Sequence, residues 1–172
     1  VGLLSLVATP IGNLEDITLR AIRVLRQATL VLAEDTRRAR TLFQAHGIRP
    51  LALERVDDHV VKEKLPWLLE ALRHGSRVAL ITDAGTPVVS DPGTVVLRAA
   101  VEAGLRVEAV PGPSAALTAL VASGFGQQGF RFVGFLPREG RSRLSALQAI
   151  ARDPLPTVFF EAPDRCGRTL GE

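Results

Sequence analysis

Short apolar runs alternate with longer amphipathic segments along the first two thirds of the chain. The short runs carry few charges, which is typical of strands buried on both faces of a parallel sheet. The amphipathic segments repeat apolar residues three and four positions apart, as in Ile17, Ala21, Val24 and Leu25, and this spacing predicts helices. We expect strands at 3–8, 29–33, 51–53, 77–81 and 105–110, and helices at 16–27, 36–46, 60–74, 94–103 and 115–123.

Strand and helix therefore alternate five times, which favours an α/β fold with a parallel, doubly wound sheet. Beyond Gly124 the pattern restarts with an expected strand at 131–135, a helix at 141–151 and a strand at 157–160. We expect an N-terminal α/β domain at 1–123 and the first part of a second α/β domain at 124–172. With only two clear strands, the second domain is expected to be truncated.

Composition narrows the class of protein. Hydrophobic residues make up 47% of the 172 residues, enough for a core, which argues against disorder. No apolar stretch reaches the roughly 18 residues of a membrane span, so we expect no membrane contact. Cys166 is the single cysteine and cannot form an internal disulfide, which favours a reducing compartment and a cytoplasmic location.

The basic residues are almost all arginine. Only Lys62 and Lys64 are lysines among the 21 basic residues. Arginine suits phosphate recognition because its planar guanidinium donates two hydrogen bonds to one anion. A bias in genomic base composition would give the same excess.

Three patterns that could suggest other chemistry carry little weight. The segment 124–129 matches G-x-G-x-x-G, but it follows a helix and precedes a strand, the reverse of a dinucleotide-binding turn. His46, His59 and His74 lack the spacing of metal ligands, so we expect no metal. Nothing near Cys166 in the sequence would activate it as a nucleophile.

The most informative loop follows the apolar run 77–81. It reads Thr82-Asp83-Ala84-Gly85-Thr86-Pro87. Gly85 lets a ligand approach the backbone and Pro87 stiffens the loop, while Asp83 places a carboxylate at the strand tip. Because open α/β sheets bind ligands at the carboxyl ends of their strands, this loop is a candidate site.

Three more loops follow expected parallel strands, at 9–13, 34–37 and 111–115. All four loops should lie at one edge of the sheet, where they would form a shared site. Glu34 and Asp35 could contact a substrate or cap the following helix. Arg37, Arg38 and Arg40 could contact phosphate or form a solvated face.

In order, these loops resemble the ribosomal small-subunit RNA methyltransferase I type of the tetrapyrrole methylase superfamily. The similarity lies in residues 7–18, 33–37, 82–87 with 90–93, 110–115 and 134–137, and it extends over nearly the whole chain. Glu161-Ala162-Pro163-Asp164-Arg165 stands where the family often has Glu-Ser-Pro-His-Arg.

The resemblance implies a class III methyltransferase fold and S-adenosylmethionine as cofactor. It also implies methylation of the ribose 2′-hydroxyl of a cytidine in 16S ribosomal RNA, free or in the small ribosomal subunit, by a homodimer. The cofactor contacts it implies are Pro10, Gly12, Asp83, Ala84, Gly85, Thr86, Pro87, Ser114 and Ala115.

Chemistry suggests the remaining roles. A ribose hydroxyl benefits from a base, and Glu34 and Asp35 are the candidate catalytic carboxylates. We expect the RNA to be held by Arg37, Arg38, Arg138, Arg141 and Arg143. The alternatives are a C-methyltransferase acting on a corrin or siroheme precursor, and a cofactor- or RNA-binding fragment without catalysis.

Overall fold

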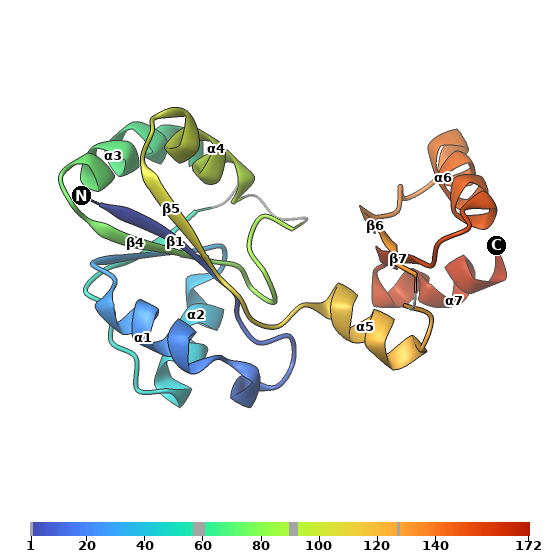
Figure 1. Ribbon diagram of the computed structural model, residues 1–172, viewed down its shortest axis with the longest axis horizontal. Coiled ribbons are helices and arrows are strands. Elements are labelled where there is room, and N and C mark those ends of the chain that lie inside the picture. Colours follow the sequence, from blue (N-terminus) through green and yellow to red (C-terminus); the bar gives the residue numbers. More distant parts are fainter. Residues whose placement is uncertain (1, 57–60, 90–92, 127) are drawn as a thin grey trace. The chain divides into compact units, whose positions relative to one another are not determined.

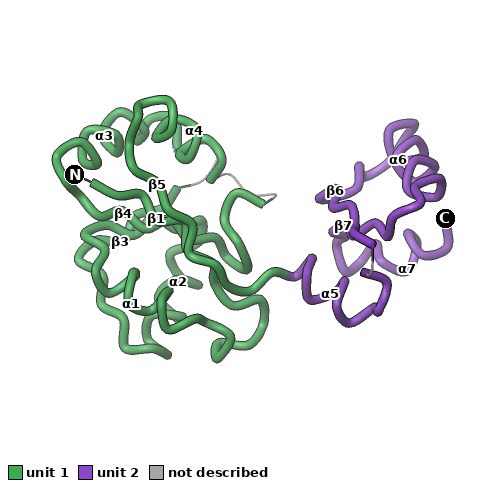
Figure 2. The backbone as a smooth tube through the Cα atoms, viewed as in Figure 1, with its two compact units in different colours: residues 1–114 green, residues 115–172 purple. Residues whose placement is uncertain are grey.

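The computed structural model describes residues 2–56, 61–89, 93–126 and 128–172. It divides into two compact units, Val1–Ser114 and Ala115–Glu172 (Figure 2). Unit 1 contains β1 (Leu3–Val7), η1 (Leu14–Asp16), α1 (Leu19–Gln27), β2 (Leu30–Ala33), α2 (Thr36–Ala45), β3 (Leu53–Arg55), α3 (Val61–Arg73), β4 (Arg77–Ile81), α4 (Thr94–Glu102) and β5 (Arg106–Val110). Unit 2 contains α5 (Ala115–Ser123), β6 (Arg131–Phe135), α6 (Gly140–Arg152), β7 (Thr157–Phe160) and α7 (Pro163–Gly171).

Unit 1 is built on a five-stranded sheet whose strands are all parallel, in the order β3-β2-β4-β1-β5. The expected parallel, doubly wound sheet is therefore confirmed. Because every strand points the same way, the loops that follow β1, β2, β4 and β5 lie at one edge.

Helices cover both faces of this sheet (Figure 1). The helices α1 and α2 pack on one face, where Leu25 and Phe43 meet Val31 in the core. The helices α3 and α4 pack on the other face, where Leu72 and Val96 are fully or almost fully buried. The two cores explain why the strand sequences are nearly continuous apolar runs.

Two boundaries in unit 1 differ from the sequence expectation. The first helix begins at Leu19 instead of residue 16, because Thr18 Oγ1 accepts a hydrogen bond from the Ala21 amide at 3.0 Å and caps it. The expected strand at 51–53 lies at Leu53–Arg55. The Val31 amide donates to the Ala52 carbonyl at 2.8 Å, so pairing with β2 decides where this edge strand runs.

Unit 2 contains a parallel pair, β6 and β7, with Phe132 and Phe160 packed at a ring-centroid distance of 4.9 Å. The sequence suggested a domain boundary at 123/124, whereas the compact units divide at 114/115, because α5 packs against β7. The helix α7 was not expected. Its signal is Pro163 at the first helical position, where proline is favoured.

Within the described residues, no helix is long and apolar enough to cross a membrane. The same residues contain no group of His, Cys, Asp and Glu side chains that could hold a metal ion. Part of the Ser90–Gly93 motif, Ser90 to Pro92, lies outside the described residues, as does His59.

Candidate functional site at the carboxyl edge of the sheet

The loops after β1 and β4 are joined through their backbones. The Thr9 amide donates to the Gly85 carbonyl at 2.9 Å, and the Gly85 amide donates to the Thr9 carbonyl at 3.0 Å. The Thr9 hydroxyl also donates to the Thr82 carbonyl at 3.1 Å. These three bonds fix the β4 loop against the β1 loop.

The β4 loop requires unusual backbone angles. Gly85 has φ +84°, and a Cβ there would lie 3.4 Å from Cγ2 of Ile11. Val88 has φ +74°, which is costly for a β-branched residue. Strain of this kind persists only where surrounding contacts hold it, and it is concentrated at ligand sites.

The loop after β5 approaches the same edge closely. The Thr86 hydroxyl donates to the Pro113 carbonyl at 3.1 Å. A Cβ on Gly112 would lie 2.9 Å from the Cβ of Ala8, so the backbone approaches β1 at a distance that only glycine permits. The loops after β1, β4 and β5 therefore form one connected structure.

Asp83 links the β4 loop to the start of α2. Its Oδ1 accepts a hydrogen bond from the Asp35 amide at 3.0 Å, and its Oδ2 lies 3.5 Å from Nε of Arg38. The side chain of Asp83 keeps 28% of its surface exposed. The carboxylate is thus held in position yet open to a ligand.

Both carboxylate oxygens of Asp35 accept hydrogen bonds from Arg37. Asp35 caps α2 by accepting from the Arg37 amide at 2.8 Å, and its two oxygens pair with the Arg37 guanidinium at 3.1 and 2.8 Å. The side-chain and then the backbone hydrogen bonds from Arg37 hold the pKa of Asp35 well below its usual range. A carboxylate with so low a pKa is a poor proton acceptor, so the geometry favours the capping role over the catalytic one.

A hollow of about 210 Å³ lies between the β1 loop, α2 and the β4 loop. Its charged lining groups are Arg38 and Asp83, and most of the rest is apolar. Complete small-molecule sites measure roughly 300–1,000 Å³, so this hollow accommodates part of such a ligand. The residues that line it are Thr9, Pro10, Leu14, Arg38, Ala39, Thr41, Leu42, Ile81, Thr82 and Asp83.

The remaining expected site residues differ in exposure. At this edge Pro10, Gly85 and Pro87 are buried, Glu34, Thr86 and Ser114 are half-buried, and Gly12, Ala84 and Ala115 are exposed. Ser114 ends unit 1 and Ala115 begins unit 2. Arg138 and Arg141 are exposed in unit 2.

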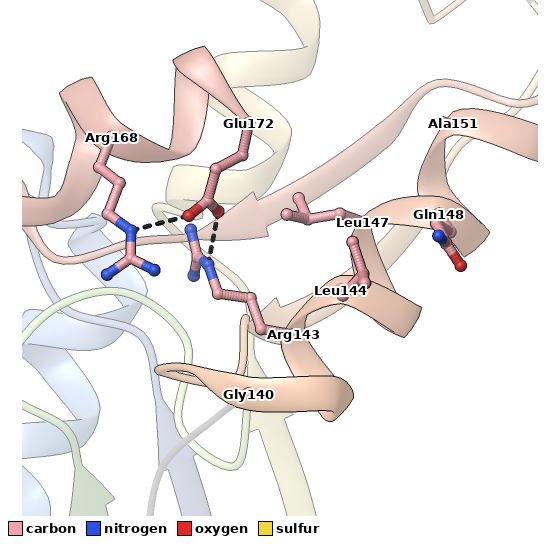
Figure 3. A pocket seen from close by; sticks show the side chains of 8 residues that line it. All are labelled: Gly140, Arg143, Leu144, Leu147, Gln148, Ala151, Arg168 and Glu172. Carbon is pink, nitrogen blue, oxygen red and sulfur yellow. Dashed lines mark hydrogen bonds and ion pairs between the residues drawn. The ribbon is translucent and has the colours of Figure 1, made fainter.

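Arg143, expected to contact RNA, is instead buried in unit 2, with 4% of its side chain exposed. Its guanidinium donates to Glu161 at 3.0 Å, to Glu172 at 2.7 Å and to the Thr169 hydroxyl at 2.7 Å. The expectation for Arg143 is wrong because these partners occupy its donors. Figure 3 shows Arg143 and Arg168 both directed at Glu172, beside a hollow of about 420 Å³ between α6 and α7.

Glu161 is the centre of this buried cluster, which the sequence reasoning missed. It accepts from the Ala162 amide at 2.9 Å and from Arg165 at 2.8 Å, in addition to Arg143 and Thr169. The Ala162 amide and then the Arg165 and Arg143 side chains lower the pKa of Glu161 to about 2. The sequence signal for this cluster was the spacing of Glu161 and Arg165, an acid and a base four residues apart whose side chains bond to each other.

The family model for tetrapyrrole (corrin/porphyrin) methylases matches residues 3–172. The chain belongs to the tetrapyrrole methylase family. Solved structures agree with this fold: the methyltransferase CobJ matches with a TM-score of 0.71 at 22% identity, over 99% of this chain and 74% of that one. The native uroporphyrin III C-methyltransferase of Thermus thermophilus matches with a TM-score of 0.63 at 23% identity, over 99% and 76%.

Curated relatives within the family carry the name ribosomal RNA small subunit methyltransferase I. The chain is 49% identical to that of Mesorhizobium japonicum, over 98% of this chain and 57% of the relative. It is 47% identical to that of Pseudomonas aeruginosa, over 99% and 60%, and 43% identical to that of Thermotoga maritima, over 99% and 76%. The chain therefore spans about 57–60% of the length of the first two of these relatives. The resemblance inferred from the loop motifs is confirmed.

Proposed function

We propose that this tetrapyrrole methylase family member is an S-adenosylmethionine-dependent methyltransferase of small-subunit ribosomal RNA. Its target is the ribose 2′-hydroxyl of a cytidine in 16S RNA. The observation that carries the proposal is the 43–49% identity to relatives named ribosomal RNA small subunit methyltransferase I. The matched solved tetrapyrrole methyltransferases are more distant, at 21–28% identity, which disfavours a corrin or siroheme substrate.

The residues at the sheet edge fit S-adenosylmethionine. The cofactor carries an ammonium group and ribose hydroxyls, which need acceptors, and Asp83 supplies a partly exposed carboxylate beside the hollow. Gly85 and Gly112 keep the backbone open where a side chain would crowd the loops. Pro10, Gly12, Ala84, Thr86, Pro87, Ser114 and Ala115 complete the proposed contact set.

S-adenosylmethionine supplies a methyl group already activated on a sulfonium, so the protein's main task is to position the reactants. The hydroxyl proton must leave as the new C–O bond forms, and an acceptor at the substrate side favours that step. The carboxylate of Asp35 already binds Arg37 and caps α2. We therefore assign the role of proton acceptor for the ribose hydroxyl to Glu34, which is half-buried directly after β2.

The proposed partners follow the same resemblance. Arg37, Arg38, Arg138 and Arg141 are exposed and suited to RNA phosphates. A homodimer in the cytoplasm is proposed from the family alone.

Calorimetric titration of the chain with S-adenosylmethionine and with its demethylated product tests the cofactor assignment. We expect both to bind, and adenosine alone, the control ligand, to bind more weakly because it lacks the amino-acid end. Transfer of labelled methyl to small-subunit RNA then tests the substrate. A folded chain that binds neither ligand, or that methylates a tetrapyrrole precursor but no RNA, would overturn the proposal.

A further inference from the structure

The two helix layers of unit 1 differ sharply in charge. The helices α1 and α2 carry six arginines and no carboxylate within their bounds. The helices α3 and α4 carry four basic and three acidic residues, which nearly balance. The six arginines, here called the α1–α2 arginine face, are Arg20, Arg23, Arg26, Arg37, Arg38 and Arg40.

The six arginines belong to one surface. Both helices lie on the same face of the sheet (Figure 1). Leu25 of α1 and Phe43 of α2 belong to one buried apolar cluster. Nη2 of Arg26 donates to the His46 carbonyl at 2.8 Å, which ties the end of α1 to the end of α2. All six arginines are exposed, so this helix layer presents their guanidinium groups to solvent.

Most of this charge is uncompensated. Arg20 and Arg26 donate to main-chain carbonyls, of Ala109 at 2.7 Å and of His46, which orients the guanidinium groups without neutralising them. Among the described residues, ion pairs on this face involve only Arg37 with Asp35 and Arg38 with Asp83.

The nearest acidic neighbours are few. Glu108 of β5 lines a small hollow together with Val24 and Gln27 of α1, and its Oε1 accepts a hydrogen bond from the Ser5 hydroxyl at 2.7 Å. Glu15 and Asp16 in η1 are exposed just before α1, and they favour the amino end of a helix electrostatically. They leave Arg23, Arg26 and Arg40, farther along the helices, without a carboxylate partner from the described part of the chain.

Charge complementarity selects the occupant. A second copy pairing through the same face would bring arginines against arginines, and like charges in close contact oppose association. An apolar partner would have to strip water from six guanidinium groups. A polyanion gains from each contact, because guanidinium pairs with phosphate through two bonds and counterions are released.

We propose that the α1–α2 arginine face is the surface on which this protein docks the phosphate backbone of folded ribosomal RNA. This inference rests on the proposed RNA methyltransferase function and names the surface that holds the substrate outside the reacting site. The arginines of α1 contribute register and affinity, and they contact neither the cofactor nor the target ribose.

The test uses Arg23→Gln with Arg40→Gln in one chain, because neither side chain supports a described hydrogen bond or the proposed cofactor site. The matched control is Arg98→Gln with Arg106→Gln, which removes the same charge from exposed positions outside this face. Affinity for purified small-subunit ribosomal RNA is measured as a function of salt. We expect the slope of log K against log salt to fall by about 0.7–0.9 per arginine in the first variant and to stay unchanged in the control.

Two companion measurements separate this inference from the proposed function. Calorimetry with S-adenosylmethionine should give wild-type affinity for both variants. If the wild-type chain binds no cofactor, the proposed function fails. If it binds cofactor while the two variants lose RNA affinity equally, the docking surface is wrong. A change of oligomeric state on light scattering, seen only in the Arg23/Arg40 variant, would assign the face to contact between copies and would also overturn it.

Discussion

Asp35 and Asp83 follow neighbouring strands, but their different hydrogen-bond partners give the two aspartates different roles. Asp35 is neutralised by Arg37, and its pKa lies far below the usual range. Asp83 is anchored by a backbone amide through one oxygen, and 28% of its side chain stays exposed. Asp35 therefore organises α2, while Asp83 is the carboxylate able to receive a ligand.

Replacing Asp83 with Asn tests this division. The amide oxygen keeps the acceptor for the Asp35 amide, but the negative charge offered to an ammonium or hydroxyl group is lost. Affinity for S-adenosylmethionine should fall roughly 10- to 100-fold, as expected for a hydrogen bond to a charged group worth about 1.5–3 kcal/mol. Calorimetry measures the loss, and Asp16→Asn, an exposed acid in η1, serves as control. Equal affinities for the two variants would remove Asp83 from the cofactor site.

At the scale of elements, the site depends on hydrogen bonds between the loops as well as on the strands that the loops follow. The pair of backbone bonds between Thr9 and Gly85, with the Thr86 bond to Pro113, joins loops that start from β1, β4 and β5. Loop conformation at this edge is thus coupled across the centre of the sheet.

Gly85→Ala should disturb this coupling. Both Gly85, at φ +84°, and Gly104, at φ +67°, adopt a left-handed backbone, so Ala costs about 1–2 kcal/mol of folding stability at either position. Only at Gly85 would the new Cβ meet a neighbour within 4 Å in another loop. Urea unfolding should show similar losses for both variants, while cofactor affinity should weaken only in Gly85→Ala. Weakening in Gly104→Ala as well would mean that global stability, rather than loop geometry, limits binding.

Helix starts and strand positions both depended partly on contacts that the sequence analysis did not foresee. Asp35 caps α2 through its side chain, which is one of the two roles expected for it, whereas the Thr18 cap places the start of α1 at Leu19 and not at residue 16. The edge strand β3 lies later than expected because its place is set by pairing with β2 alone. Pro163 marks the start of α7, a signal that apolar periodicity does not contain.

At the scale of the whole molecule, unit 2 depends on a buried charge cluster as well as on apolar contacts. Glu161 accepts hydrogen bonds from Ala162, Arg165, Arg143 and Thr169. Arginine here ties α6 and α7 to the end of β7. Removing a partner from such a buried cluster leaves a charge without compensation, which is strongly destabilising.

This cluster makes the stability of unit 2 depend on pH. The pKa of Glu161 in the folded chain is about 2, below its ordinary value of 4.5. Its contribution is therefore complete above pH 4.5 and is lost as the pH falls from 4.5 towards 2. Six of the seven phenylalanines lie in unit 2, so the near-ultraviolet phenylalanine bands report on it, while Trp67 fluorescence reports on unit 1.

We expect the phenylalanine bands to weaken across that pH range in the wild-type chain. In Glu161→Gln, the phenylalanine bands should be lost at a lower urea concentration at pH 7, because unit 2 is less stable. The bands should also no longer weaken between pH 4.5 and 2. Asp164→Asn, which changes an exposed acid in the first turn of α7, should behave as wild type. An unchanged acid transition in Glu161→Gln would show that other carboxylates control the acid stability of unit 2.

The sequence by itself determined the alternation of strand and helix, the parallel sheet, the convergence of loops at one edge and the family. These features depend on periodicity and on short motifs, which are local properties of the chain. Only the tertiary structure decided which charged residues are available, because charge pairing depends on partners far apart in sequence. Arg38 and Asp83 are 45 residues apart, and Arg143 and Glu161 are 18 apart. Folding thus turned Arg143 into a buried structural residue and left Arg23 exposed on α1, although both are arginines on amphipathic helices.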